Sequence, residues 1–221
     1  MNQVLTLKLK LNHSADQKSA FDSFSLSYRD ALNHTSKIAF VNKKTSNKIK
    51  IQELSYYEIR EKFNIGAQLA CSIARDVGAK YKTQWTNFKK HRANVAKGYT
   101  KKRYKGLDNP VEYKARTVTL QHKKDYSFDF KKGLVSLPTL TGRIKMTYSG
   151  WNKHLNLLKT NKIGAANLIY DKNKQQYYLC VAIEIEVNDL DLSKIKKVKG
   201  CDLGQQYLAV TQSNESEVKF Y

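Results

Sequence analysis

Asp202 is the residue whose surroundings most suggest catalysis, because a carboxylate stands there inside a short apolar run. The run Val198–Gly204 (VKGCDLG) predicts a buried strand that ends at a glycine turn. A carboxylate in such a strand is costly to bury unless it is paired or bound to a metal. We therefore expect Asp202 to hold Mg²⁺ at a strand end, where two such ions promote phosphodiester cleavage.

The Asp-x-Gly pattern is short, and two other interpretations stay open. In the first, Asp202 simply caps a turn, which is a common role of aspartate. In the second, it is similar to the phosphate-loop aspartate of actin-like ATPases, where a Thr or Ser usually follows the glycine. Gln205 follows the glycine here, so the nuclease interpretation is favoured.

A second kind of chemistry is concentrated between residues 80 and 105, which hold ten basic side chains and no acidic one. Ammonium and guanidinium groups neutralise phosphates and release condensed counterions. The alternative is a solvated helix face followed by a flexible basic tail. We predict that the sugar-phosphate backbone of nucleic acid is bound by Lys80, Lys82, Lys89, Lys90, Arg92, Lys97, Tyr99, Lys101, Lys102, Arg103, Tyr104 and Lys105.

Aromatic residues are interleaved with these cations, and we expect two different roles for them. Trp85 and Phe88 continue the apolar face of a helix and are assigned to the core. Tyr99 and Tyr104 lie beyond that face and are candidates for stacking on unpaired bases. Phosphate contacts carry no sequence information directly, so the run does not predict sequence-specific binding.

The composition of the whole chain agrees with a polyanionic partner. Its 221 residues hold 40 Lys and Arg against 19 Asp and Glu, a formal net charge of +21. Self-repulsion on this scale lowers stability unless a polyanion relieves it. Simple solubilising charge is the alternative, although added acidic charge serves solubility better.

The other residue types exclude several classes of protein. Cys71, Cys180 and Cys201 are too few and too scattered for a disulfide framework or a Cys-x-x-Cys metal site, and they fit a reducing compartment. We therefore expect a cytoplasmic protein. No stretch of about 18 apolar residues is present, so we expect no membrane partner. The five histidines have no partners at metal-ligand spacing.

The first elements needed to position these residues are a strand and a helical block. Leu5–Leu11 alternates with polar residues and predicts a half-buried strand. Helical periodicity then runs from residue 13 to about residue 97. Capping boxes are predicted at Ser14 and Ser55, and Asn64 is predicted to cap the third helix.

A period of two returns at Arg116 and continues to Val187, which predicts several short antiparallel strands. The expected fold is α+β: an antiparallel β-barrel of residues 1–12 and 108–188, with a helical lobe of residues 13–107 inserted. A linker is expected at 189–197. At 198–221 we expect the first hairpin of a further, unfinished domain, with Tyr207–Thr211 as the partner of Val198–Gly204.

This layout resembles the transposon-encoded TnpB proteins of the OrfB transposase family, which are relatives of type V CRISPR effectors. The best match is Gly200–Gly204 (GCDLG) followed by Tyr207–Val210 (YLAV), which is similar to the family's first RuvC segment. The resemblance extends weakly over the whole chain. It implies a wedge-like barrel, an inserted helical recognition lobe and then a ribonuclease-H-like RuvC domain.

The resemblance also implies RNA-guided DNA cleavage, with a guide RNA and target DNA as partners. Asp202 is the family catalytic position and Mg²⁺ ligand that this sequence matches. The family also needs a Glu and an Asp from later RuvC segments and a Cys-x-x-Cys zinc ribbon, which the 221 residues do not contain. One carboxylate cannot hold two metals, so we expect a truncated product that does not cleave alone.

Two other functions stay open. The chain could be a non-cleaving regulator or repressor derived from the same family, which binds RNA and DNA without cutting. It could also be an unrelated RNA binder of the ribosomal type, in which case the resemblance around Asp202 is accidental.

Overall fold

The computed structural model describes residues 2–187, 193, 195–204, 206–214 and 216–221. These residues form two compact units, of which the larger is Val4–Ile185 and the smaller comprises the described residues within 1–3 and 186–221. Of the linker predicted at 189–197, residues 189–192 and 194 lie outside the described residues.

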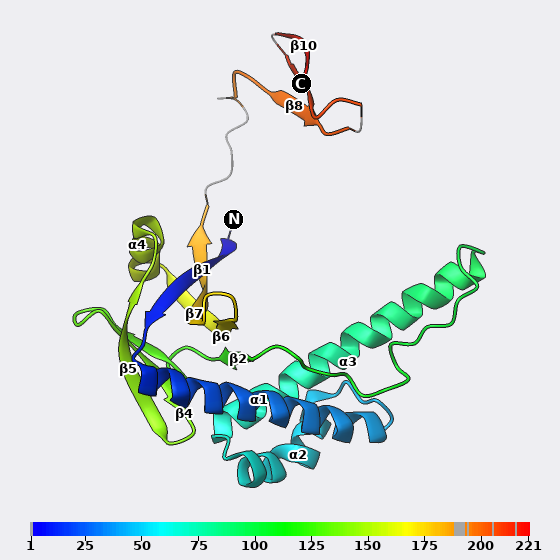
Figure 1. Ribbon diagram of the computed structural model, residues 1–221. Coiled ribbons are helices and arrows are strands. Elements are labelled where there is room, and N and C mark those ends of the chain that lie inside the picture. The colour runs from blue at the N-terminus through cyan, green and yellow to red at the C-terminus, as the bar shows by residue number, and fades with distance from the viewer. Residues whose placement is uncertain (1, 188–192, 194, 205, 215) are drawn as a thin grey trace. The chain divides into compact units, whose positions relative to one another are not determined.

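The larger unit is α+β and is built on a curled antiparallel sheet of seven strands (Figure 1). The strand order is β2-β6-β7-β1-β5-β4-β3, so β2 and β3 are the two edges of a half-barrel. The first strand lies between β7 and β5, which confirms that it shares a sheet with strands much later in the chain. The strands are β1 (Asn2–Asn12), β2 (Thr117–Leu120), β3 (Ser127–Asp129), β4 (Leu134–Thr139), β5 (Gly142–Ser149), β6 (Lys162–Asp171) and β7 (Gln176–Glu186).

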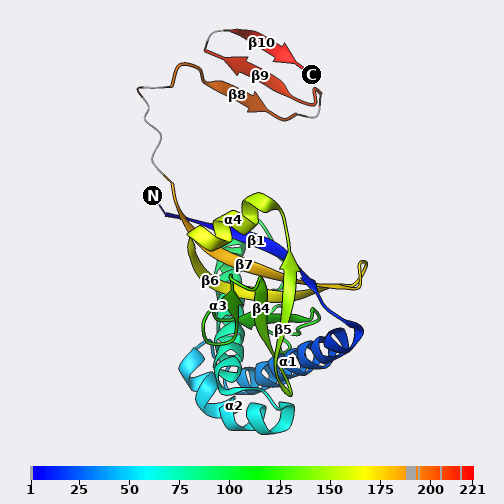
Figure 2. The ribbon, with the colours of Figure 1, turned by 90° about the vertical axis from the view of Figure 1, so that its left-hand side faces the viewer.

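Three helices lie between β1 and β2 and pack against one another, and the first and third of them also contact strands of the sheet (Figure 2). They are α1 (Ala15–Val41), α2 (Lys48–Phe63) and α3 (Ala67–Ala96). A fourth helix, α4 (Asn152–Thr160), interrupts the strands between β5 and β6 and was not predicted from the period-two pattern.

The helix caps show where local sequence decided the structure and where it did not. The Ser14 capping box is confirmed, with the Gln17 N–H donating to Ser14 Oγ at 3.2 Å. The box predicted at Ser55 is wrong, because α2 begins earlier at an Asn47 cap and Ser55 donates to Ile51 O within the helix. Asn64 ends α2 at φ 51° instead of starting α3, which begins after Gly66.

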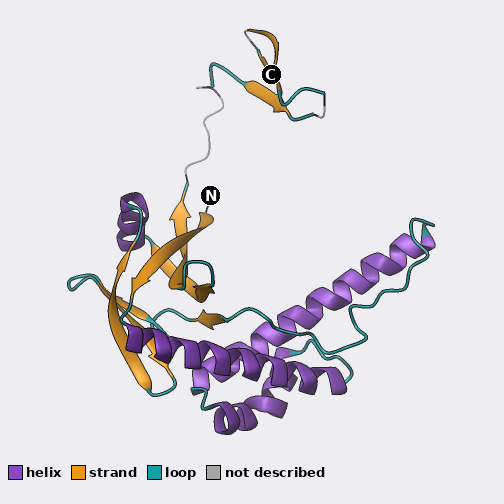
Figure 3. Cartoon of the chain, viewed as in Figure 1, coloured by secondary structure: helices purple, strands orange, loops and turns teal. Residues whose placement is uncertain are grey.

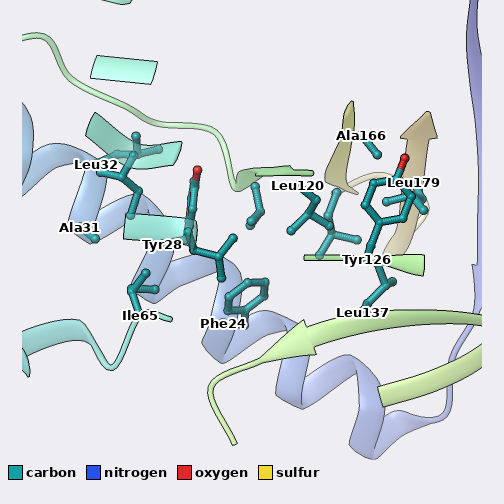
Figure 4. Close-up of a cluster of buried hydrophobic side chains, with 14 of the residues drawn as sticks. Phe24, Tyr28, Ala31, Leu32, Ile65, Leu120, Tyr126, Leu137, Ala166 and Leu179 are labelled. Atoms are coloured by element: carbon teal, nitrogen blue, oxygen red, sulfur yellow. The ribbon is translucent and has the colours of Figure 1, made fainter. Parts of the chain in front are cut away.

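The core lies between the helices and the inner face of the sheet. Leu7, Leu9 and Leu11 of β1 are fully buried, as the alternation predicted. Figure 4 shows Phe24 and Tyr28 of α1 in one cluster with side chains from the sheet. Burying a large apolar side chain stabilises a fold by about 1.5–3 kcal/mol, so this cluster holds the larger unit together.

A polar clamp fastens α1 to the sheet beside this core. Asp22 Oδ1 accepts hydrogen bonds from Arg116 and from the Tyr177 hydroxyl, both at 2.8 Å, and Oδ2 accepts one from Lys18 at 2.8 Å. Burial works to raise the pKa of the Asp22 carboxyl. The hydrogen bonds from Lys18 and Tyr177 and the nearby positive charges outweigh it and lower that pKa.

The smaller unit is a three-stranded antiparallel sheet in the order β10-β9-β8, made of β8 (Lys199–Asp202), β9 (Val210–Ser213) and β10 (Ser216–Phe220). The strand predicted at Val198–Gly204 is present as β8, but its predicted burial is wrong, because every residue of β8 is exposed. Its partner β9 begins at Val210 and not at Tyr207, and Val210 lies opposite Asp202. A single layer of short strands has no second layer to bury its apolar residues against.

Candidate nucleic-acid interface

The candidate interface lies on the outer half of α3. The buried face of this helix starts at Leu69 and ends at Tyr81, beyond which none of its described residues is buried. In Figures 1 and 3 the C-terminal half of α3 projects beyond the other helices of the larger unit. We call residues 80–105, the end of this helix and the segment after it, the basic arm.

The segment after α3, residues 97–113, returns along the helix and is packed onto it; we call it the returning segment. The Tyr104 ring lies 5.8 Å from the Phe88 ring and 5.7 Å from the His91 ring, between centroids. Its hydroxyl donates to Gln84 Oε1 at 2.5 Å. A Cβ at Gly106 would lie 2.5 Å from that hydroxyl oxygen and from Gln84 Oε1, so a glycine permits this close approach. The arm therefore has two sides, the helix and the returning segment.

The returning segment is then fastened to α1 at the base of the arm. Asn33 exchanges two hydrogen bonds with the backbone of Tyr113, at 2.7 and 3.1 Å. Ser36 Oγ donates to the Val111 carbonyl at 2.7 Å. Both ends of the arm are therefore anchored in the core, which presents the charges on a defined surface.

All ten basic side chains of the arm are exposed. Within the described part of the chain, only Arg103 among them forms an ion pair, and its partner Asp108 lies just outside the run. Lys82 and Lys89 are seven residues apart, so they lie on one face of the helix and about 10 Å apart along its axis. The other nine exposed cations form no ion pair with a described residue, and together they make a surface that attracts a polyanion.

A hollow lies between the end of α3 and the returning segment. Its volume is about 480 Å³, and its wall combines aromatic rings with cations. Rings provide stacking surfaces, and cations next to them hold phosphates, which is the combination that binds unpaired nucleotides. The lining residues are Phe88, His91, Arg92, Val95, Ala96, Lys101, Lys102, Arg103 and Tyr104.

The four aromatic residues predicted near the cations occupy different surroundings. Tyr99 is 75% exposed, so its ring is accessible to a base. Tyr104 is half-buried against α3, with its ring used in packing. Trp85 and Phe88 are half-buried at the edge of the core cluster, and Trp85 Nε1 donates to the Lys44 carbonyl at 2.9 Å.

A scan against models of known protein families and a search of the curated proteins found no match for this chain. The resemblance to TnpB proteins therefore rests on the residues around Asp202 and stays a prediction.

Asp202 lies in the smaller unit, at the end of β8, where its side chain is exposed. No cluster of three or more His, Cys, Asp or Glu side chains suited to a metal occurs among the residues that the structure describes. The described donors at Asp202 amount to one carboxylate, whereas Mg²⁺ requires several oxygen ligands. Across the same described residues, no helix has the length and apolar character needed to span a bilayer.

Proposed function

We propose that this protein binds the sugar-phosphate backbone of nucleic acid through the basic arm. The observation that carries the proposal is the set of ten exposed cations between residues 80 and 105, with no acidic residue among them. Each cation that meets a phosphate releases condensed counterions, which favours binding by entropy. The packing of Tyr104 and the anchors at Val111 and Tyr113 hold these charges in place before a ligand arrives.

Single-stranded nucleic acid suits the arm best. Tyr99 offers an exposed ring for stacking, and the hollow next to Arg92 and Tyr104 adds half-buried rings beside cations. Aromatic rings stack on any base, and phosphate contacts carry no information about the base sequence. Recognition of a particular sequence would then have to come from base pairing with a bound RNA.

We further propose that the chain is the binding portion of a TnpB-like protein, with a guide RNA and target DNA as its partners. The GCDLG motif around Asp202 and the helical block between β1 and β2 support this assignment. In that proposal Asp202 is the catalytic position and Mg²⁺ ligand of the first RuvC segment, and Mg²⁺ would supply the phosphodiester chemistry only in a completed site. A non-cleaving regulator is the second candidate, because the exposed cations of the basic arm support binding without any cleavage chemistry.

Salt-dependent binding by a charge variant tests the central proposal. The triple substitution K82Q, K89Q and K90Q should lower the slope of log K against log salt by about 2, because each phosphate contact on a single strand contributes about 0.7. Affinity for single-stranded RNA at 0.1 M salt should fall about 100-fold. The measurement is fluorescence anisotropy with a labelled 40-nucleotide RNA.

The matched control removes three exposed lysines from α2, by K48Q, K50Q and K62Q. It has the same net charge as the arm variant and should bind nearly as the parent does. Thermal unfolding of both variants should match the parent, because the substituted side chains are exposed. A parent protein that shows no salt-sensitive binding to RNA or DNA would overturn the proposal.

The RNA that copurifies with the protein separates the candidate partners. One discrete RNA would support a guide-binding protein, whereas bulk ribosomal RNA would favour the ribosomal type. Binding should be unchanged by Asp202→Ala, because that residue is assigned to cleavage and not to binding. Loss of RNA binding in this variant would contradict that division of roles.

A further inference from the structure

A second cationic surface lies on the larger unit, on the outer face of the sheet. Lys8 and Lys10 of β1 alternate with Leu7, Leu9 and Leu11, whose side chains are fully buried. Successive side chains of a strand point to opposite faces. The two lysines therefore leave the sheet on the side away from the core, and both are exposed.

Pairing within the sheet adds further residues to these lysines. Lys10 lies opposite Ser149 of β5, and β7 is the neighbour of β1 on its other side (Figure 2). The turn between β6 and β7 adds a third ammonium group. Together these residues line an open groove of about 480 Å³, formed by Lys8, Lys10, Ser149, Gly150, Lys174 and Tyr178. We call this the sheet groove.

The groove is shaped by specific contacts. The Lys8 ammonium lies 4.1 Å from the centroid of the Tyr178 ring, a cation–π contact that holds the charge over β7. A Cβ at Gly150 would lie 3.2 Å from Leu9 Cδ2, so the glycine lets the chain pass close to β1.

The lining of the groove has no acidic side chain. The nearest acid along the turn is Asp171, whose Oδ1 accepts the backbone N–H groups of Asn173 and Lys174 at 3.1 and 3.2 Å. None of Lys8, Lys10 and Lys174 forms an ion pair among the residues that the structure describes. Three unneutralised ammonium groups around a groove with a hydroxyl at Ser149 suit the oxygens of a phosphodiester.

We propose that the sheet groove is a second backbone-binding site, which holds phosphates of the same nucleic acid strand that the basic arm binds. This inference rests on the proposed function. An acidic protein would also be attracted to three lysines. Nucleic acid is favoured because the basic arm, on the same compact unit, combines cations with exposed or half-buried rings.

Binding of one ligand at two sites makes a quantitative prediction. The triple substitution K8Q, K10Q and K174Q should lower the salt slope for a labelled 40-nucleotide RNA by about 2 and weaken binding at 0.1 M salt about 100-fold. In a variant that combines the groove and arm substitutions, the two losses should multiply, because independent contacts to one ligand add in free energy. The α2 variant with K48Q, K50Q and K62Q is the control for net charge.

The outcomes separate this inference from the function on which it rests. Loss of binding in the arm variant with parental binding in the groove variant would overturn the groove alone. Parental binding in both variants would overturn both proposals. Equal losses in the groove and α2 variants would also overturn the groove, because they would reflect net charge alone. Preferential binding of an acidic protein that the groove substitutions abolish, with RNA binding intact, would assign the groove to that partner.

Trp151 provides a local readout of the groove. It follows Gly150 directly, is 62% exposed and is one of two tryptophans in the chain. In a Trp85→Phe variant its fluorescence reports this end of the sheet without interference. RNA should change the Trp151 emission, and the groove substitutions should abolish the change. An emission that is unaffected by saturating RNA would place the ligand elsewhere.

Discussion

The two halves of α3 belong to one helix but face different surroundings. From Ala67 to Tyr81 the helix buries eight residues against the rest of the larger unit. From Lys82 to Ala96 it buries none and carries basic residues on its exposed surface. The comparison shows that burial determines the residue types of the inner half, whereas the outer half is free to carry charge.

The two halves should therefore respond differently to substitution. The inner half is held by core packing, which contributes most of a helix's stability in a folded protein. The outer half is supported by the returning segment through Tyr104 and Gly106. Changes in the inner half should affect folding, and changes in the outer half should affect binding.

The largest effect is expected at the boundary between the halves. Tyr81 is fully buried, and its hydroxyl donates to the Ser36 carbonyl at 2.9 Å. Tyr81→Ala should lower the free energy of unfolding by about 3–5 kcal/mol, because it removes an aromatic core side chain. Lys82→Ala, one residue further on, should leave the free energy of unfolding unchanged. Thermal and urea unfolding would measure the stability of both variants. A similar loss of stability in the two variants would contradict the division of the helix into a core-packed and an exposed half.

A smaller effect is expected on binding at the tip of the arm. Tyr99→Ala should weaken binding of single-stranded RNA by about 1–3 kcal/mol, which is the usual contribution of a stacked base. The fold should be unaffected, because the ring is 75% exposed. Double-stranded RNA serves as the comparison ligand, since its bases are not free to stack. An equal loss for both ligands would assign Tyr99 to another role.

The inner half of α3 contains an acidic residue, Asp76, whereas the outer half contains none. Substitution of Asp76 should therefore change how stability depends on pH. Burial raises the pKa of Asp76 above its ordinary value of 3.8, although a hydrogen bond with Thr119 and the charge of Arg75 oppose this. Its contribution to stability is therefore fully present below about pH 3.8 and is lost as pH rises through the raised pKa. Asp76→Asn should be at least as stable as the parent at pH 7.

The stability difference between Asp76→Asn and the parent should close as pH falls toward 4. Asp22 provides the opposite control, because its pKa is lowered. Its stabilisation is present above its ordinary pKa and is lost as pH falls through the lowered value. Asp22→Asn should therefore be less stable than the parent at pH 7. Unfolding curves at several pH values that show the same sign for both variants would contradict this assignment.

The smallest effect is expected within the returning segment. Tyr104→Phe removes the hydrogen bond to Gln84 while it keeps the ring against Phe88. It should lower the local opening free energy of residues 97–106 by about 1 kcal/mol, the typical net worth of one hydrogen bond. Hydrogen exchange would measure this, with global unfolding unchanged. Exchange as slow as in the parent would show that ring packing alone holds the segment.

Several parts of the fold followed from local pattern alone. The alternation in β1, the Ser14 capping box and the apolar face of α3 were all recognisable in the sequence. The errors came where a local signal competed with a longer-range one. Ser55 and Asn64 have cap chemistry, but packing of α2 against α1 and α3 placed the helix ends elsewhere.

The sequence by itself determined that ten cations would stand together without an acid, because neighbours in a chain stay neighbours in any fold. Tertiary structure decided which tyrosine stays accessible, because the chain folds back and packs Tyr104 on α3 while it leaves Tyr99 exposed. It also brought Lys8, Lys10 and Lys174 to one groove. Pairing between strands that are distant in the sequence brings these three lysines together, and no local sequence pattern predicts that pairing.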